Sequence, residues 1–384
     1  MGQLLRLGIA GLGNAGHSVL RDLDKISGVV LTAVADVRKE VLESFREKSK
    51  EAQTFDSVEA MCNSREVDAV WIATPNEFHA EHTITAAGYG KHVICEKPMA
   101  LSLEECDRMI EAAEGNGVKL LMYSKAGDPP ILKMREVVAS GRLGRLIQIN
   151  TWNYKGWLRS ARLPSEVDTS KGGGVVYRQA PHQVDIVRCI GGGMVKRVRA
   201  TTGRWSPRFD TEGDYTAFVE FADGAPATLV FNGYGFFDVT ELTWGIGEGG
   251  HEVSNRYHKK DSEGPVDPAT RYAMPLRAEM RERQGERQQP FYGLTLVSCE
   301  KGDMRQSPNG LYLYTEEGRR ELPCPPYLDR GMELLKLYEA ITRGRFIWTD
   351  GRWGKATLEV VLAILQSSKE KREITLSHQA PCSI

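Results

Sequence analysis

The stretch LRLGIAGLGNAGHSVLRDL, residues 5–23, has the pattern of an apolar strand, a glycine turn and a helix. The turn has the spacing G-x-G-x-x-G and consists of Gly11, Gly13, Asn14, Ala15 and Gly16. In such a unit the first glycine permits the tight turn, the second lets the backbone approach a pyrophosphate, and the third lets the helix pack on the strand. Backbone N–H groups at the start of the helix would then hold the phosphates. The stretch therefore predicts a dinucleotide-binding fold.

A second apolar strand, VVLTAVAD, ends in Asp36, which lies about 20 residues after Gly16. An acid at that distance is expected to hold the ribose hydroxyls of NAD. Arg38 follows two residues later and would suit the extra phosphate of NADP instead. Because a carboxylate beside that phosphate would be repulsive, the pair favours NAD as the cofactor and leaves NADP possible.

A later strand, HVICEKP, ends with Glu96 and with Lys97, which stands directly before a proline. The residue before a proline is pushed out of the helical region, so Lys97 is displayed on an extended or turning backbone. The preceding strand, VDAVWIATP, runs into Thr74, Pro75 and Asn76. Ligands of parallel sheets bind beyond the carboxyl ends of the strands, which predicts that Lys97 lies beside the nicotinamide ring. A surface lysine at a strand-to-helix turn is the alternative.

Strands and helices alternate up to about residue 125, and then the pattern changes. We predict an α/β protein with an N-terminal Rossmann domain, residues 1–125, built on a doubly wound parallel sheet. Residues 126–384 contain several runs with strand-like alternation and predict an α+β domain on a large, mostly antiparallel sheet, for substrate binding and oligomerisation. Alternating apolar residues on its other face favour a homo-oligomer. The polar stretch at about 251–289 is expected to be a solvated insertion that is partly helical over 275–288, with a subunit arm or active-site cover as the alternative.

The stretch KGGGVVYRQAPHQVDIVRCIGGG predicts a helix that begins after the glycines and carries His182. Arg178 precedes His182 by four residues and Gln179 precedes it by three, so both can lie near it on a helix. Tyr154 and Trp157 follow a predicted strand and could stack on a substrate ring. Ordinary packing against the sheet is an equally good explanation for these two aromatic residues.

Composition limits the remaining function classes. The chain has 384 residues, 41% of them hydrophobic and 26% charged, which is typical of a globular protein. A formal net charge of −1 gives no electrostatic reason to expect nucleic acid or an anionic membrane as a partner. The seven cysteines are scattered without a C-x-x-C pair, so no metal site is predicted. No apolar run is long enough to span a bilayer, and no signal peptide is evident, so a cytoplasmic protein is expected.

Five motifs occur in a fixed order, namely GIAGLGNAG, IATPNEFHAEH, CEKPMA, GGGVVYRQAPHQVD and DGRWGKATLEVVLAILQSS. Over nearly the whole chain they resemble the Gfo/Idh/MocA family of NAD(P)-dependent oxidoreductases. The resemblance implies that Lys97 and His182 are the active-site lysine and histidine. It also implies that Thr74, Pro75, Asn76 and His79 form a motif on the cofactor side.

One position departs from the family pattern. Many members place an Asp four residues before the histidine, and here that position is Arg178. The variant YRQAPHQVD resembles the branch of phthalate dihydrodiol dehydrogenases, and some enzymes that oxidise the sugar of glycosides are also similar. A guanidinium would suit a carboxylate through bidentate hydrogen bonds, or it would grip sugar hydroxyls. It cannot replace an Asp as a proton acceptor.

Together these observations predict hydride transfer between nicotinamide and a secondary alcohol on a polyhydroxylated ring, either a sugar or glycoside or a cis-dihydrodiol. His182 is expected to act as the base and Lys97 to hydrogen-bond the same oxygen, although either could take the proton. One alternative is a dehydrogenase strictly for carboxylated, phthalate-type cis-dihydrodiols. A second alternative is a protein that senses NAD without turnover.

Overall fold

The computed structural model describes residues 4–253, 264–268, 270 and 287–384. The chain divides into two compact units. The described part of the first is 4–123 with 328–355, and the described part of the second is 124–253, 264–268, 270, 287–327 and 356–384. Most of the predicted insertion, including the helix expected within 275–288, lies outside the described residues.

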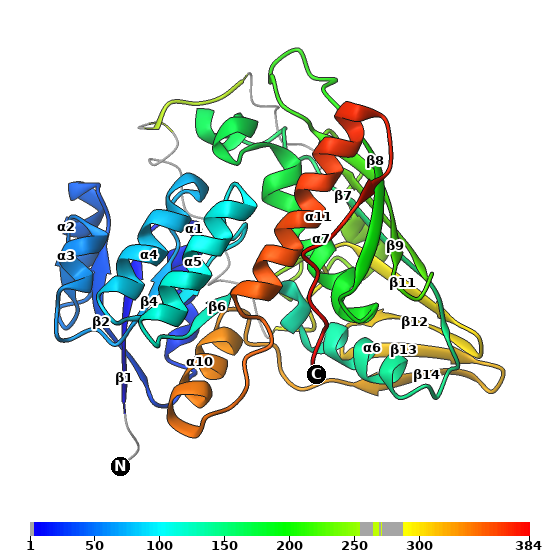
Figure 1. Ribbon diagram of the computed structural model, residues 1–384, viewed down its shortest axis with the longest axis horizontal. Coiled ribbons are helices and arrows are strands. Elements are labelled where there is room, and N and C mark those ends of the chain that lie inside the picture. Colours follow the sequence, from blue (N-terminus) through cyan, green and yellow to red (C-terminus); the bar gives the residue numbers. More distant parts are fainter. Residues whose placement is uncertain (1–3, 254–263, 269, 271–286) are drawn as a thin grey trace. The chain divides into compact units, whose positions relative to one another are not determined.

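The first unit contains a six-stranded parallel sheet with the strand order β3-β2-β1-β4-β5-β6 (Figure 1). Its strands are β1 (Leu5–Ala10), β2 (Val29–Ala35), β3 (Gln53–Phe55), β4 (Ala69–Ile72), β5 (His92–Cys95) and β6 (Leu120–Met122). Its helices are α1 (Asn14–Leu23), α2 (Lys39–Lys48), α3 (Val58–Cys62), η1 (Asn76–Phe78), α4 (His79–Gly88), α5 (Leu103–Gly115) and α10 (Gly331–Arg343). This order reverses direction beside β1 and is that of a doubly wound Rossmann sheet, as predicted.

The second unit contains a nine-stranded sheet with the order β14-β13-β12-β11-β7-β10-β9-β8-β15. Its strands are β7 (Leu146–Tyr154), β8 (Val195–Gly203), β9 (Asp214–Phe221), β10 (Pro226–Asn232), β11 (Leu294–Cys299), β12 (Gly302–Ser307), β13 (Gly310–Thr315), β14 (Gly318–Pro323) and β15 (Ile374–Thr375). All of its pairings are antiparallel except that of β7 with β10. The prediction of a large, mostly antiparallel sheet is confirmed.

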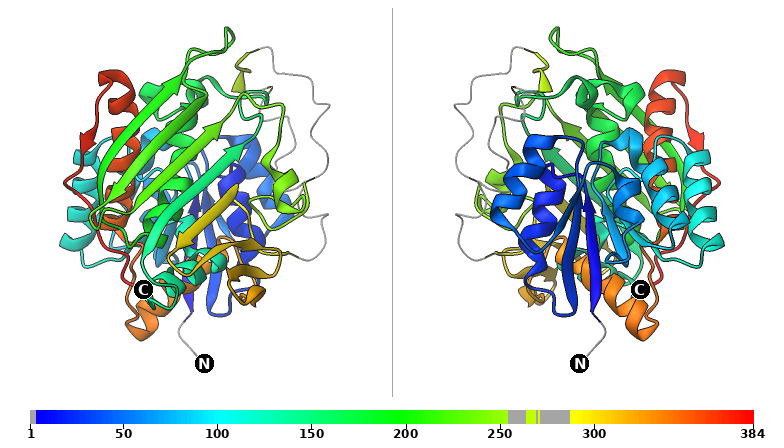
Figure 2. Two further views of the ribbon diagram at one scale, coloured as in Figure 1. Left: turned by 90° about the vertical axis from the view of Figure 1, so that its right-hand side faces the viewer. Right: turned by 90° about the vertical axis from the view of Figure 1, so that its left-hand side faces the viewer.

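Helices of the second unit lie against one face of the nine-stranded sheet, and the left view of Figure 2 looks onto its strands from the other face. They are η2 (Lys125–Gly127), α6 (Pro129–Ala139), η3 (Pro164–Val167), η4 (Thr169–Lys171), α7 (Gly174–Ile190) and η5 (Val239–Thr243), with α11 (Gly351–Glu370) continuing from the first unit. The buried amide of Gln183 anchors α7 to the sheet. Its nitrogen donates to the carbonyl oxygens of Thr151 and Val230, and its oxygen accepts from the hydroxyl of Tyr215.

The first unit includes a late segment of the chain that the sequence analysis assigned to the second domain. The expected second domain included residues 328–355, whereas in the structure these residues belong to the first unit. Leu334 and Leu337 on α10 are fully buried in the same apolar cluster as Leu7, Ile9 and other residues of the Rossmann sheet. The alternation of strands and helices ends near residue 125, so the sequence pattern contains no sign of this late return of the chain.

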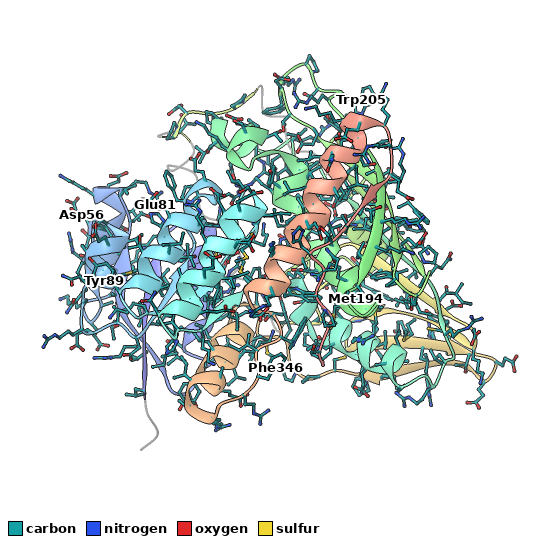
Figure 3. All side chains as sticks on the ribbon, viewed as in Figure 1. Asp56, Glu81, Tyr89, Met194, Trp205 and Phe346 are labelled. Atoms are coloured by element: carbon teal, nitrogen blue, oxygen red, sulfur yellow. The ribbon has the colours of Figure 1, made fainter. Side chains whose placement is uncertain are left out.

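Several apolar side chains remain exposed on their own, among them Met194, Trp205 and Phe346 (Figure 3). Single exposed apolar residues are normal on protein surfaces. Among the residues that the structure describes, no helix combines the length and the apolar character needed to cross a bilayer.

Candidate active site

Four neighbouring strands of the Rossmann sheet end at the same level. Ala10 at the end of β1 pairs with Ala35 of β2 and with Ile72 of β4, and Ile72 pairs with Cys95 of β5. The residues that follow these strands are Gly11, Asp36, Thr74 and Lys97. The carboxyl edge of the sheet therefore gathers the positions that the sequence singled out, as expected for a parallel sheet.

In the glycine loop after β1, Gly13 has open space beside its backbone, whereas Gly11 and Gly16 are closely surrounded. Gly11 has a φ of +94°, and a Cβ there would lie 2.6 Å from the carbonyl oxygen of Ala73. A Cβ on Gly16 would collide with the carbonyl oxygen of Gly11. A Cβ on Gly13 would meet nothing within 4 Å, and Gly13 is the N-cap of α1. The loop therefore has an open backbone position at a helix N-terminus, which fits the pyrophosphate of a dinucleotide.

Asp36 lies buried beside this loop. Its Oδ2 accepts from the backbone N–H of Leu12 at 2.8 Å and from Nη2 of Arg38 at 2.7 Å. Its Oδ1 accepts from the backbone N–H and from Nε of Arg38, at 3.0 and 2.8 Å. Burial alone would raise the pKa of Asp36, but these hydrogen bonds outweigh it and hold the pKa below its usual value. The carboxylate is thus ionised and already bonded to Arg38.

The motif after β4 is tied to the motif after β5 by His79. This imidazole is buried, with Nδ1 2.7 Å from the carbonyl oxygen of Pro98 and Nε2 2.9 Å from that of Thr74. The hydroxyl of Thr74 lies 2.9 Å from Nδ1 of His82. Pro75 is exposed and Asn76 is partly exposed, so both can be reached by a cofactor, whereas the ring of His79 is enclosed.

Glu96 and Lys97, which follow β5, also differ in their exposure to solvent. Lys97 is partly exposed, whereas Glu96 is buried and accepts a hydrogen bond from Nε of Arg330 at 2.7 Å. Burial opposes the charge of Arg330, but Glu96, Tyr123 and Asp329 together outweigh this effect and raise the pKa of Arg330. Glu96 therefore lies behind the site, where its bond to Arg330 supports the backbone that displays Lys97.

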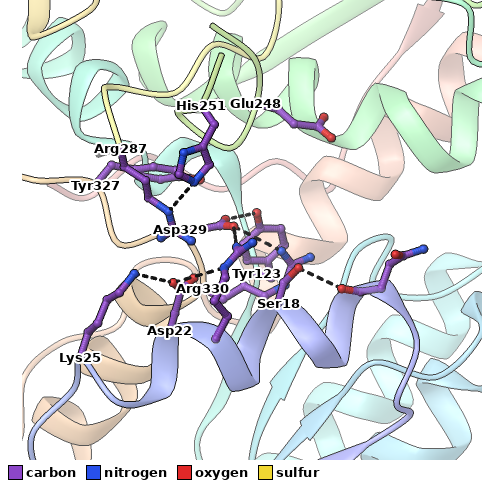
Figure 4. A network of polar contacts seen from close by, with 12 residues as sticks. Ser18, Asp22, Lys25, Tyr123, Glu248, His251, Arg287, Tyr327, Asp329 and Arg330 are labelled. Atoms are coloured by element: carbon purple, nitrogen blue, oxygen red, sulfur yellow. Dashed lines mark hydrogen bonds and ion pairs between the residues drawn. The ribbon is translucent and has the colours of Figure 1, made fainter. Parts of the chain in front are cut away.

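Arg330 also makes polar contacts with Tyr123 and Asp329, which are labelled in Figure 4. The guanidinium of Arg330 lies over the ring of Tyr123, 4.3 Å from its centroid, and 3.7 Å from the carboxylate of Asp329. Asp329 accepts from the hydroxyl of Tyr123 at 3.0 Å and from Arg21 of α1 at 3.4 Å. This network connects the loop before α10 to the helix that follows the glycine turn.

In the second unit, α7 carries His182, and hydrogen bonds to other segments hold this helix both before and after that residue. Near its start, the backbone N–H of Val176 donates to the buried carboxylate of Glu212 at 3.2 Å. Beyond His182, the carboxylate of Asp185 accepts from Ser124 at 2.6 Å and from Thr357 at 2.5 Å. His182 itself is buried, and its ring centroid lies 4.5 Å from that of Tyr292.

The two predicted neighbours of His182 have distinct partners. Nη2 of Arg178 lies 2.9 Å from Oε1 of Glu166, a salt bridge between partly buried groups. The amide oxygen of Gln179 accepts from the hydroxyl of Tyr292 at 2.8 Å. Gln179 and His182 therefore touch the same tyrosine, whereas the charge of Arg178 is matched by a carboxylate.

Lys155 also lies in this group of side chains, although no motif in the sequence pointed to it. Its Nζ lies 5.0 Å from the ring centroid of Tyr292 and 3.4 Å from Oε2 of Glu248. The ammonium group and the ring of His182 thus lie close to the same aromatic ring. Lys155 follows directly after β7, so it is the end of that strand that places it there.

The two aromatic residues proposed as substrate contacts, Tyr154 and Trp157, lie in different environments. Trp157 is buried, its ring lies under the guanidinium of Arg162 at 4.0 Å, and its carbonyl oxygen accepts two hydrogen bonds from that group. This environment corresponds to packing, the second of the two explanations. Tyr154 is partly exposed and lies edge-on to Phe237, with 6.0 Å between ring centroids.

Sequence reasoning missed five residues of this region, and they share one property. Each belongs to a series of contacts that starts at a predicted residue and reaches a distant segment of the chain. The five are Lys155, Glu166, Glu248, Tyr292 and Arg330. None belongs to a motif, and a single sequence holds no signal that would pair them. Within the described part of the chain, no three or more His, Cys, Asp or Glu side chains are gathered in a way that could hold a metal ion.

Two family models and several known proteins match the chain. Residues 5–124 match the model of an oxidoreductase family with an NAD-binding Rossmann fold, named GFO_IDH_MocA, and residues 131–237 match the GFO/IDH/MocA C-terminal domain. The chain is 31% identical over 378 residues to a 1-carboxy-3-chloro-3,4-dihydroxycyclohexa-1,5-diene dehydrogenase of Comamonas testosteroni, covering 95% of each protein.

Two further relatives extend the comparison. A myo-inositol 2-dehydrogenase of Thermotoga maritima is 30% identical over 199 residues, which are 51% of this chain and 58% of that protein. A solved structure from Bordetella bronchiseptica RB50, described as a dehydrogenase, is 37% identical, with a TM-score of 0.84 and coverage of 97% of this chain and 100% of that one. The chain belongs to the GFO/IDH/MocA family of oxidoreductases and is an NAD-dependent dehydrogenase.

Proposed function

We propose that the protein transfers hydride between NAD and a secondary alcohol on an uncharged polyhydroxylated ring, a sugar or a glycoside. Bound NAD would supply the hydride acceptor at its nicotinamide ring. Lys97 of the first unit donates a hydrogen bond to the reacting oxygen and stabilises its alkoxide character. His182 of the second unit takes the proton of the hydroxyl, because an imidazole has a reference pKa near 6.5 and can act as a base at neutral pH.

The cofactor part of this proposal is supported by the carboxyl edge of the Rossmann sheet. The open backbone of Gly13, the buried carboxylate of Asp36 and the partly exposed Lys97 all follow strands that end at the same level. A dinucleotide laid along that edge would have its phosphates at α1 and its nicotinamide toward β5. Lys97 places an amine at the nicotinamide end of that edge.

The observation that favours an uncharged substrate is the pairing of charges near His182. Arg178 lies 2.9 Å from Glu166, and Lys155 lies 3.4 Å from Glu248. A substrate carboxylate would have to compete with one of these two acids for its cation, at a desolvation cost. Hydroxyl groups need neutral donors and acceptors instead, and Gln179 and His182 are groups of that kind, with the amide of Gln179 already bonded to Tyr292 and to the carbonyl oxygen of Arg178.

A panel of substrates tests this proposal. The purified protein is mixed with NAD and with either neutral sugars and glucosides or carboxylated cis-dihydrodiols, and NADH formation is followed by absorbance. We expect kcat/KM to be at least roughly tenfold higher for the best neutral ring, which corresponds to about 1.4 kcal/mol of transition-state binding. A higher value for the carboxylated diols would contradict the proposal. Tight NAD binding without turnover on any alcohol would support an NAD sensor.

Two variants assign the roles in the same assay. Lys97→Met and His182→Asn should each lower kcat by about 10²–10⁴-fold, the usual contribution of a general base or acid, while the Kd for NAD changes little. Lys48→Met, at an exposed position of α2, is the control and should retain full activity. Normal turnover by His182→Asn would show that another group takes the proton.

The second candidate is a carboxylated cis-dihydrodiol, which is the type of compound named for the relative from Comamonas testosteroni. Arg178 supports it, because a guanidinium binds a carboxylate through two parallel hydrogen bonds. In that case Glu166 would release Arg178 on substrate binding, and Glu166→Gln would lower the KM for the carboxylated diol. For a neutral ring, the same variant should leave KM unchanged or raise it.

We also propose that the protein is a homo-oligomer that associates through the outer face of the nine-stranded sheet. Trp152 of β7 and Phe218 of β9 are 37% and 44% exposed there. Their strands flank β10, where Val230 pairs with Trp152 and Thr228 with Phe218. A second copy of the chain would cover these rings with its own sheet.

A further inference from the structure

His79 is the first residue of α4, and its side chain is only 1% exposed. Its ring lies between two backbone carbonyl groups, with Nδ1 2.7 Å from the oxygen of Pro98 and Nε2 2.9 Å from the oxygen of Thr74. Both distances are those of good hydrogen bonds. Within the described part of the chain, these two carbonyl groups are the hydrogen-bond partners of the ring.

The two carbonyl groups belong to different loops of the site. Thr74 follows β4 in the loop that begins the cofactor-side motif, and its hydroxyl contacts His82. Pro98 directly follows Lys97 in the loop after β5. A planar imidazole has a fixed distance between its two nitrogens, so a ring bonded at both sides sets the separation of these two loops.

The number of protons on the ring decides how strongly it can hold them. A neutral imidazole has one N–H and one acceptor nitrogen, whereas an imidazolium has two N–H groups. Burial lowers the pKa of His79, and the carbonyl oxygens of Pro98 and Thr74 and the carboxylate of Glu96 act in the opposite direction. A ring flanked by carbonyl oxygens on both sides can donate to both of them only when each of its nitrogens carries a proton.

We infer that His79 is a positioning residue that couples the cofactor loop at Thr74 to the loop that presents Lys97. It does not touch the substrate, because its ring is enclosed by these loops. The inference goes beyond the proposed function but rests on it in one respect, since it takes Lys97 as the group that acts on the reacting oxygen. A displacement of a reacting group by about 1 Å can cost roughly 10²-fold in rate, so loss of this support should be visible in kinetics.

Three variants separate the two contacts. His79→Phe keeps a ring of similar size without any donor. His79→Asn places an amide N–H near the position of Nδ1, toward Pro98, and His79→Gln places one near the position of Nε2, toward Thr74. We expect His79→Phe to lower kcat roughly 10- to 100-fold and to raise the KM for NAD. His79→Asn should recover mainly kcat, and His79→Gln should recover mainly the KM for NAD.

His378→Phe, at an exposed position in the second unit, is the control and should leave both constants unchanged. Thermal unfolding of every variant is recorded, because a purely structural histidine would lower the Tm without this division between kcat and KM. The inference is overturned if His79→Phe stays within about twofold of the wild type in both constants, or if the Asn and Gln variants have identical kinetics. The comparison of Asn with Gln holds even if His79→Phe does not fold.

Lys97→Met in the same assay distinguishes failure of this inference from failure of the proposed function. Full turnover by Lys97→Met would remove the catalytic role of the lysine, whatever His79 does. An inactive Lys97→Met beside an unaffected His79→Phe would remove the positioning role alone.

Discussion

Asp36 accepts four hydrogen bonds, three of them from Arg38 and one from the backbone of Leu12. A carboxylate has about four acceptor positions, so the ribose hydroxyls of NAD can bond to Asp36 only when the guanidinium moves aside. The spacing of Asp36 from the glycine turn was visible in the sequence. The salt bridge with Arg38 follows from the turn between β2 and α2, which brings residues two apart in the chain face to face.

Arg38 therefore sets the balance between the two dinucleotides. We expect Arg38→Ala to raise the KM for NADP roughly tenfold or more, because the cation that offsets Asp36 near the extra phosphate is lost. The KM for NAD should fall or stay within about threefold, because Asp36 becomes available to the ribose. Both constants are measured at constant ionic strength, with Arg46→Ala on α2 as the control. An unchanged ratio of the two KM values would contradict this role.

Helix α10 lies late in the sequence, yet it and the residue before it pack against the Rossmann sheet of the first unit. The residue before it, Arg330, forms the buried pair with Glu96, although 234 positions separate the two. Leu334 and Leu337 of the helix lie in the Rossmann core. The helix itself has ordinary amphipathic spacing, but nothing in that spacing tells which apolar surface it covers.

Removal of Arg330 should be costly because it would leave Glu96 buried without its cation. Breaking a buried ion pair from one side costs about 3–5 kcal/mol. We expect Arg330→Met to lower the free energy of unfolding by an amount in that range, as measured by urea denaturation followed by circular dichroism. Arg343→Met on the same helix removes an exposed pair with Glu339 and should cost about 1 kcal/mol or less. An equal loss of unfolding free energy in the two variants would show that the buried pair stabilises the protein no more than the exposed pair does.

At the scale of the whole molecule, the outer face of the nine-stranded sheet carries exposed apolar side chains, among them Trp152 and Phe218. Antiparallel strands commonly bury one face and leave the other to solvent or to a partner. Along β9, Tyr215, Ala217 and Val219 are buried while Thr216 and Phe218 are exposed, so the alternation of the sequence is realised in the sheet.

If this face joins two copies of the chain, charges placed on it should separate them. We expect the double variant Trp152→Glu and Phe218→Glu to have a smaller molar mass than the wild type by size-exclusion chromatography with light scattering. Phe346→Glu changes a ring that is more exposed but lies in the first unit, and it should keep the mass of the wild type. A wild-type protein that is already monomeric would contradict the proposal.

Local patterns in the sequence determined the parts of this protein that depend on neighbouring residues. Glycine spacing and the alternation of strands with helices predicted the Rossmann sheet, and the ends of its strands predicted where Gly11, Asp36 and Lys97 would gather. Period-two alternation likewise predicted the sheet of the second half. These features follow from backbone geometry, which a short segment already specifies.

Only the tertiary structure decided which distant side chains meet the predicted ones. It placed Arg330 behind Glu96, Glu248 beside Lys155 and Tyr292 against His182. It also enclosed the ring of His79 between two loops and buried Trp157. Such contacts arise from the packing of elements that are far apart in the chain, and no periodicity within any one segment records them.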